Sequence, residues 1–199
     1  TVGKPSATIS NEDLNVVYRG IDNRFSVSVP GIASENVRVS VNGGTATKSS
    51  DGNYIIRTNQ DGDITIVVAA VVEGREQTMG SGVFRVKYLP DPKAYLQFAD
   101  AGGIPRLIQE GRVTRRQVQG AKLIASYGEE ELVKANFTVT SFTMQTIVGV
   151  ATNNSGELNQ RQLEMLNRLE GADFILLKNI QAVGPDGKTR SLNPITVEL

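Results

Sequence analysis

The residue types that most often carry out chemistry in proteins are missing from this sequence. Its 199 residues include no His and no Cys. The chain therefore has no thiolate nucleophile, lacks the commonest general base, and lacks the usual ligands of zinc and iron–sulfur sites. A Ser-Lys nucleophile pair needs a serine three residues before a lysine, and this spacing does not occur. Carboxylates and glycine-rich turns are the chemical candidates that remain.

One glycine-rich segment, from Ala182 to Thr189, resembles a phosphate-binding loop with Ala in place of the first Gly. A phosphate loop must open a helix whose N-terminal N–H groups hold the phosphates. The residues that follow are strand-like and include Pro194. We therefore interpret Pro185-Asp186-Gly187 as a hairpin turn.

A second segment has the spacing of a calcium loop at its start. Asn59, Asp61 and Asp63 alternate as its first ligands would, but Ile64 replaces the required Gly and Ala70 the final Glu. A solvated Asp-Gly turn is the better interpretation, so we predict no metal site and no cofactor.

An acidic triplet, Glu129, Glu130 and Glu131, lies beside Tyr127 in a loop that follows Gly128. Consecutive carboxylates do not converge on one substrate atom, so an enzyme that uses them is the weakest hypothesis and we predict no catalytic residues. A solvated loop is the ordinary interpretation of such a run. Tyr127 and the triplet are our candidates for contact with a protein partner.

The charge balance argues against polyanionic partners. The chain has 21 Lys plus Arg against 21 Asp plus Glu, with the signs interspersed. We therefore expect no nucleic acid as a partner. The longest apolar run, Ile64 to Val72, is far shorter than the roughly 20 residues that span a bilayer, so this segment of protein is not expected to insert into a membrane.

Short strands dominate the first 89 residues. Alternating patterns such as Phe25 to Val29 and Val37 to Val41 place one face of each strand on a core. Asn42-Gly43-Gly44, Asp51-Gly52-Asn53 and Asp61-Gly62-Asp63 are predicted to be tight hairpin turns. We predict further strands over residues 14–20, 54–58, 63–74 and 82–89.

The strand that ends this half carries the clearest face assignment. Phe84, Val86 and Tyr88 are expected to point inward, and Arg85 and Lys87 outward. About seven short strands in this length predict an immunoglobulin-like β-sandwich that lacks the Cys and Trp residues of antibody domains.

A junction is predicted at Tyr88-Leu89-Pro90-Asp91-Pro92, because two prolines fix φ and remove two donors. The chain then divides into an immunoglobulin-like β-sandwich at residues 1–89 and a β-rich α+β domain at residues 90–199. The fold class is thus mainly β, with two short helices packed on a β-sheet in the second domain.

Helix signals appear only in the second half. Thr114 and Asn159 are predicted N-caps, and Leu163, Leu166 and Leu169 share one face of a helix that Gly171 ends. The segment 111–118 resembles 156–163, and each is followed by an Ala, a polar residue and a Phe that enters an apolar strand. We interpret this as a possible internal helix–strand repeat.

Five separated segments together resemble the carboxy-terminal half of the PorM/GldM family. They are SNEDLNVVYRGIDN (residues 10–23), VSVPG (27–31), FRVKYLPDPKAYL (84–96), SF (141–142) and GPDGKTRSLNPI (184–195). The resemblance runs through essentially the whole chain in order.

This resemblance implies a non-enzymatic periplasmic component of the type IX secretion and gliding-motility machinery. It implies a homodimeric rod whose inner-membrane helix, not contained in this sequence, partners a PorL/GldL-type proton-driven motor protein. The distal domains would contact a PorK/PorN (GldK/GldN)-type ring beneath the outer membrane. The alternative hypothesis is an extracytoplasmic carbohydrate-binding or adhesion module, which rests on analogy of fold alone.

Overall fold

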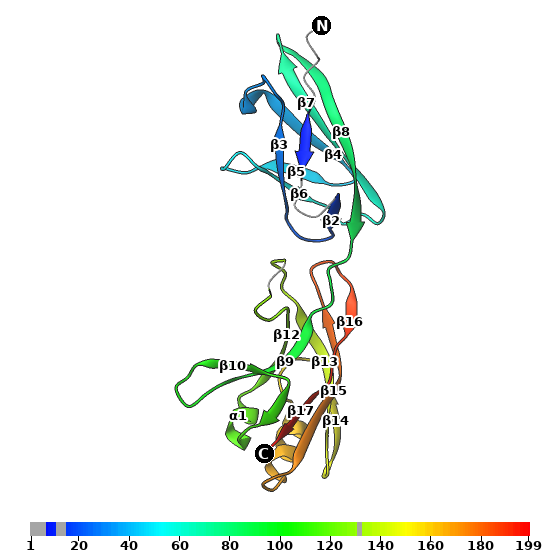
Figure 1. The fold of residues 1–199 in the computed structure, drawn as a ribbon. Coiled ribbons are helices and arrows are strands. Elements are labelled where there is room, and N and C mark those ends of the chain that lie inside the picture. The colour runs from blue at the N-terminus through cyan, green and yellow to red at the C-terminus, as the bar shows by residue number, and fades with distance from the viewer. Residues whose placement is uncertain (1–6, 11–14, 131–132) are drawn as a thin grey trace. The chain divides into compact units, whose positions relative to one another are not determined.

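The chain forms two compact units, Thr1–Leu89 and Pro90–Leu199, in a computed structural model that describes residues 7–10, 15–130 and 133–199. Figure 1 shows that strands dominate both units and that helices occur in the second. Each unit has its own hydrophobic core, and each is described by itself below.

The first unit is an immunoglobulin-like β-sandwich, as the sequence predicts. One sheet has the order β1-β3-β6-β5 and the other β2-β8-β7-β4. This is the division of strands found in constant-type immunoglobulin domains, with the first edge strand split between the sheets. The strands are β1 (Thr8–Ser10), β2 (Val16–Tyr18), β3 (Asn23–Ser28), β4 (Val37–Asn42), β5 (Thr45–Lys48), β6 (Tyr54–Arg57), β7 (Asp63–Val72) and β8 (Arg75–Lys87).

An aromatic pair joins the two sheets of the sandwich. The ring of Phe25 on β3 meets that of Phe84 on β8 edge to face, with centroids 5.0 Å apart, and both side chains are buried. Ile56, Ile64 and Ile66 are buried around them. Packed apolar side chains thus join the two sheets in a chain that has no Cys for the inter-sheet disulfide of antibody domains.

Two of the three predicted hairpin turns are wrong. Gly43, Gly52 and Gly62 all have positive φ, as expected. Only the turn at Gly52, however, joins strands that pair with each other, β5 and β6. The turns at Gly43 and Gly62 carry the chain from one sheet to the other. Turn chemistry specifies the reversal of the chain but not the partner of the next strand.

The face assignment of the last strand is mostly confirmed. Phe84 is buried, while Arg85 and Lys87 are exposed. The prediction for Tyr88 is wrong, because β8 ends at Lys87 and the Tyr88 side chain is 46% exposed. Strands β1 and β5 were not predicted, since Thr and Ser give their short segments no apolar alternation.

The second unit is an α+β domain, also as predicted. A three-stranded sheet has the order β10-β9-β12, and a larger one has the order β11-β17-β15-β13-β14, with β16 paired to β15. The elements are β9 (Lys93–Ala99), β10 (Pro105–Ile108), β11 (Glu110–Arg112), α1 (Arg115–Gln119), β12 (Lys122–Ser126), β13 (Thr138–Thr146), β14 (Gly149–Asn153), α2 (Gln160–Asn167), β15 (Phe174–Val183), β16 (Thr189–Ser191) and β17 (Ile195–Glu198).

Both predicted N-caps are confirmed, and each forms a complete capping box. Thr114 accepts from the backbone N–H of Gln117, whose side chain accepts from the Thr114 N–H. Asn159 and Gln162 do the same at α2. The predicted end of α2 is wrong, because the helix stops at Asn167. The internal repeat stays a hypothesis, although its two segments begin their helices in the same way.

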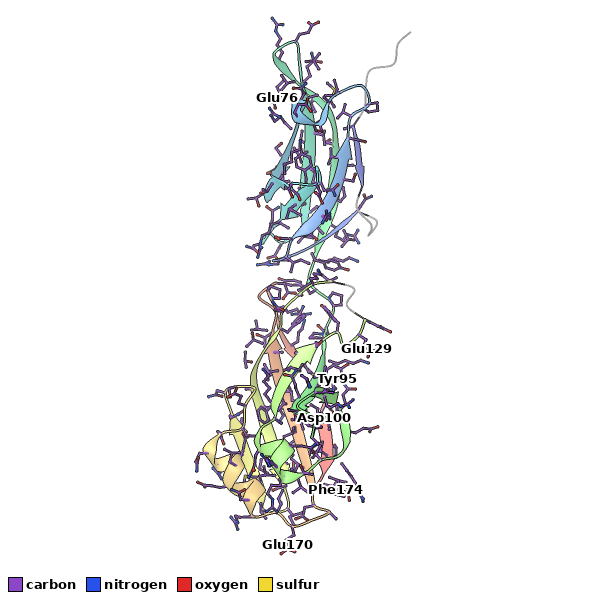
Figure 2. All side chains as sticks on the ribbon, turned by 90° about the vertical axis from the view of Figure 1, so that its left-hand side faces the viewer. Glu76, Tyr95, Asp100, Glu129, Glu170 and Phe174 are labelled. Atoms are coloured by element: carbon purple, nitrogen blue, oxygen red, sulfur yellow. The ribbon has the colours of Figure 1, made fainter. Side chains whose placement is uncertain are left out.

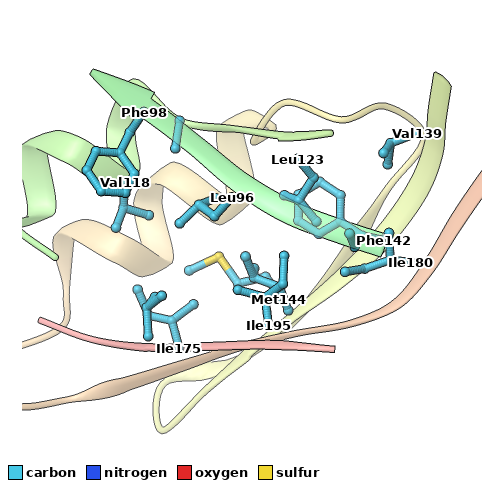
Figure 3. Packing of buried hydrophobic residues seen from close by; sticks show 14 of the residues in the cluster. Leu96, Phe98, Val118, Leu123, Val139, Phe142, Met144, Ile175, Ile180 and Ile195 are labelled. Carbon is cyan, nitrogen blue, oxygen red and sulfur yellow. The ribbon is translucent and has the colours of Figure 1, made fainter. Parts of the chain in front are cut away.

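The core of the second unit lies between its two sheets. Figure 3 shows Leu96 and Leu123 from the smaller sheet facing Met144 and Ile195 from the larger one. The buried residues of this cluster include Phe98, Val118, Phe142, Leu166, Leu169, Ile175, Leu177 and Ile180.

Replacing Phe25 by Ala is expected to destabilise the first unit by about 3 to 5 kcal/mol, because it empties the position between the sheets. Val83→Ala is the matched control: Val83 is 61% exposed, and its truncation should cost about 0.5 kcal/mol or less. Hydrogen exchange read by mass spectrometry would locate the loss. If Phe25→Ala and Val83→Ala lost the same stability, the assignment of Phe25 to the core would be contradicted.

Candidate interaction sites

One of the carboxylates that the sequence offers for chemistry, Asp61, has structural partners. Asp61, in the calcium-like segment, forms an ion pair with Arg19 and accepts from the Tyr88 hydroxyl at 3.2 Å. In the part of the chain that the structure describes, no three His, Cys, Asp or Glu side chains are grouped so that they could hold a metal ion. Within the same residues, no helix is long and apolar enough to cross a bilayer.

The phosphate-loop-like segment is a hairpin turn, as predicted. It joins β15 to β16, which pair antiparallel from Gln181–Ser191 to Val183–Thr189. The Gly187 N–H donates to the Gly184 carbonyl at 3.0 Å, and Gly187 has a φ of 78°. A strand follows, so no helix N-terminus is present to receive a phosphate.

This turn supplies half of a buried ion pair. Asp186 in the turn accepts two hydrogen bonds from Arg190 on β16, at 3.0 Å from Nη1 and 2.6 Å from Nη2. Both side chains are at least 99% buried. The hydrogen bonds with Asp186 raise the pKa of Arg190 above its ordinary value. A bidentate arrangement of this kind fixes both side chains in position.

Arg190 also binds the start of the second unit. Its Nε donates to Asp91 at 2.7 Å, and its Nη1 donates to the Lys188 carbonyl at 2.9 Å. The guanidinium lies 5.2 Å from the centre of the Phe137 ring. The buried Arg190 guanidinium thus contacts the hairpin turn, the predicted junction residue Asp91 and an aromatic ring.

Tyr127 belongs to the same cluster. Its hydroxyl donates to the Pro90 carbonyl at 2.7 Å, and its ring meets Phe137 edge to face at 5.4 Å. Gly184 is required beside that ring, since a Cβ there would lie 2.7 Å from Phe137 Cε1. We call Pro90, Asp91, Tyr127, Phe137, Asp186 and Arg190 the entry cluster. It holds the first two residues of the second unit from two sides.

The acidic triplet is placed only in part. Glu129 and Glu130 are exposed, and Figure 2 shows Glu129 on a loop at the surface. Glu131 lies outside the described residues. Tyr127, which the sequence groups with these glutamates, is half-buried in the entry cluster. No hydrogen bond or ion pair of the Glu129 or Glu130 side chain is found among the residues that the structure describes.

The predicted junction residues are divided between the two units. Tyr88 packs its ring 5.5 Å from the guanidinium of Arg19, within the first unit. Leu89 is the last residue of that unit, and Pro90 begins the second. Asp91 binds Arg190, as described above, and Pro92 is buried directly before β9.

Sequence reasoning missed Arg190 and two asparagines. Asn193 binds the backbone of Ala94 on β9, accepting from its N–H at 2.8 Å and donating to its carbonyl at 3.2 Å. Asn23 binds Tyr18 on β2 in the same way, at 2.8 and 2.9 Å. Asn193 and Ala94 are 99 residues apart, so no local pattern marks that contact. Asn23 and Tyr18 are five residues apart, but the Ile56 carbonyl that Asn23 also binds is 33 residues away. The only signal for Arg190 was its position four residues after a turn Asp.

A surface loop in the second unit presents apolar side chains. Asp100 accepts at 2.9 Å from the N–H groups of Gly102 and Ile104 and from Nε of Arg106. The Ile104 hydrogen bond is the main cause that lowers the pKa of Asp100. Ile104 in this loop is 57% exposed, and Leu107 on β10 directly after it is 41% exposed. Other large exposed apolar side chains of this unit are Ile147, Val150 and Phe174.

Two family models together match nearly the whole chain. Residues 6–87 match the third domain of GldM, and residues 90–199 match the C-terminal domain of GldM. The two matched domains are consecutive and meet where the two units meet. The two units thus define a β-rich component of the type IX secretion and gliding machinery. The chain belongs to the GldM family, as the resemblance found in the sequence indicates.

Similarity to other known proteins is low. No curated protein matches the chain. Among solved structures, domains 6–7 of the surface layer protein SbsC are 10% identical, with a TM-score of 0.30 and coverage of 97% of both chains. The C-terminal domain of the polypeptide BspA of Streptococcus agalactiae is 9% identical, with a TM-score of 0.28 and coverage of 98% of this chain and 100% of that one. These scores carry no argument about fold or function.

Replacing Arg190 by Met is expected to destabilise the second unit by about 3 kcal/mol, because it removes two charge-assisted hydrogen bonds from a buried carboxylate. Asp91→Asn is the matched control, with an expected cost of about 1 kcal/mol or less, since the Asp91 side chain is 63% exposed. Denaturant unfolding measures both. If Asp91→Asn lost more stability than Arg190→Met, the buried Asp186–Arg190 pair would not be the main stabilising contact of this cluster.

Acidification is expected to loosen the loop from Asp100 to Arg106. The pKa of Asp100 is lowered from 3.8 in the folded chain, so its contribution is complete above about pH 4 and is lost as the pH falls below 3.8. NMR shifts of the Gly102 and Ile104 amides would follow this titration. Asp100→Asn should abolish it. An unchanged titration of these amides in Asp100→Asn would show that another group is responsible.

Proposed function

We propose that this chain is the distal, non-enzymatic part of a periplasmic rod in the type IX secretion and gliding machinery. The rod acts as a homodimer and couples a PorL/GldL-type proton-driven motor in the inner membrane to a PorK/PorN (GldK/GldN)-type ring at the outer membrane. An N-terminal helix outside this sequence anchors it. The observation that carries this proposal is the match of both units, in order, to consecutive GldM domains.

The side-chain contacts support a mechanical role. Asp61, Asp91 and Asp186 each bind an arginine, and Arg190 is held by two carboxylates and a carbonyl. These groups stabilise the folded units and the segments through which the chain enters and leaves them. A rod that passes force between two partners needs units that resist opening when their ends are pulled.

The acidic loop remains the proposed contact with the ring. Glu129 and Glu130 are exposed, and Tyr127 and Gly128 connect them to the entry cluster. Negative charge on an exposed loop favours a partner surface with positive charge. Exposed Ile104 and Leu107 offer apolar contact area on the same unit.

A pull-down with the ring proteins tests this assignment. The double variant Glu129→Lys/Glu130→Lys is expected to weaken capture at least tenfold, because it reverses the loop's charge. Glu164→Lys/Glu170→Lys, which changes two other exposed glutamates of the second unit, should leave capture unchanged. If the two double variants weakened capture equally, the acidic loop would not be part of the interface with the ring.

Light scattering on the purified chain tests the wider proposal. A dimer, or a monomer that the ring proteins capture, is the expected result. A strict monomer with no affinity for them would overturn the proposed role.

A further inference from the structure

β2, the second strand of the sandwich, is paired with β8, the strand that leaves it. β2 and β8 run parallel, with Val16 opposite Arg85, Val17 opposite Val86 and Tyr18 opposite Lys87. Two further backbone bonds extend this ladder: the Arg85 N–H donates to the Asn15 carbonyl, and the Arg19 N–H donates to the Lys87 carbonyl, both at 2.9 Å. In the described part of the sandwich this is the one parallel pair.

The direction of pairing decides how a pulling force acts on these bonds. In a parallel pair, the N-terminal end of one strand and the C-terminal end of the other lie at opposite ends of the ladder. A force between the two ends of the unit therefore acts along the strands and strains all the bonds together. A force applied to both strands at the same end of the ladder breaks the bonds one at a time. The force needed to open the ladder is then smaller than for loading along the strands.

A side-chain amide holds the other edge of β2. Asn23, at the start of β3, accepts from the Tyr18 N–H at 2.8 Å and donates to the Tyr18 carbonyl at 2.9 Å. It also donates to the Ile56 carbonyl on β6 at 3.2 Å. Because Asn23 takes both polar groups of Tyr18, β2 is bound on one edge by β8 and on the other by the opposite sheet.

Burial and flanking bonds add to this hold. Val17, at the centre of β2, is fully buried in the sandwich core. Directly after β2, the Gly20 N–H donates to the Thr58 carbonyl at 2.9 Å, and its carbonyl accepts from Arg57 at 3.0 Å. Sliding β2 along β8 would therefore break bonds to both sheets and expose an apolar side chain in the same step.

We propose that the β2–β8 pair, with Asn23, is a mechanical clamp that bears force along the strands of the first unit. Its use in force transmission rests on the function proposed above, whereas the clamp itself is a property of the sandwich. β1 lies upstream and pairs with β3 over three residues, so it is released first and the load then falls on β2.

Single-molecule pulling in two directions tests the clamp directly. Because the chain contains no Cys, introduced cysteines give unique attachment points. Handles at the two chain ends load the ladder along its length. Handles at Asp22→Cys and the C-terminal end load it from one end, since Asp22 follows β2 on the side where Tyr18 meets Lys87. The second unit is common to both arrangements and serves as the reference.

The first unit is expected to open at a force at least twice as high in the first arrangement as in the second. Each released residue adds about 3.6 Å, so the shorter first unit is distinguished from the second by its length increment. Equal opening forces in the two arrangements would overturn the clamp.

A matched pair of variants isolates one backbone bond. Arg19→Pro removes the N–H that binds the Lys87 carbonyl, whereas Arg19→Ala keeps this bond and removes the same side chain. Only the proline variant should lower the opening force along the strands. If it does not fold, Asn23→Asp tests the other edge, because it keeps the acceptor for Tyr18 and loses the donors. Forces equal to those of the parent chain in Asn23→Asp would then overturn the proposal.

The clamp and the proposed function fail in different experiments. Loss of the direction dependence removes the clamp and leaves capture by the ring proteins untouched. If instead the opening force depends on direction but the ring proteins do not capture the chain, the proposed function is overturned and the clamp stands.

Discussion

The structure depends on hydrogen bonds that side chains make to the backbone of the segments where the chain enters each unit. Tyr18 lies on β2, near the start of the first unit, and Ala94 lies on β9, the first strand of the second. In each residue an asparagine amide binds both the N–H and the carbonyl. β2 lies at the edge of its sheet, and Ala94 lies beyond the residues of β9 that pair with β10, so each has backbone groups that no strand pairs on one side. Here Asn23 and Asn193 satisfy them with groups that the fold holds in place.

The buried charges must also have hydrogen-bond partners. Arg190 is nearly inaccessible to water, and such a cation is stable only when its donors are bound. Asp186, Asp91 and the Lys188 carbonyl provide these partners and so fix the first residues of the second unit. The polar residues at the ends of both units therefore hold the chain in place, as the mechanical role proposed above requires.

Local patterns in the sequence were enough to predict much of the fold. Alternation of Phe25 and Val27 with serines marks a half-buried strand, and Thr114 and Asn159 begin their helices with capping boxes. Which strands pair with each other was harder to predict. Gly43 and Gly62 mark turns, but only the distant pairing of β4 with β7 and of β6 with β3 shows that these turns cross between sheets.

The contacts on which the proposals rest were the hardest to predict. Asn23 meets the Ile56 carbonyl, and Arg190 meets Asp91 across 99 residues of sequence. Neither contact has a spacing that local periodicity could reveal. Tyr127 was a candidate for partner contact for its place beside the acidic triplet, and the structure adds that its hydroxyl binds the Pro90 carbonyl.

Hydrogen exchange at the amides of Tyr18 and Ala94 tests most directly whether the entry strands are fixed in this way. The account predicts that both amides exchange only when the whole unit unfolds, at the rate of the buried strands β7 and β15. Exchange at the rate of exposed loops, with no further change in Asn23→Ala or Asn193→Ala, would contradict it.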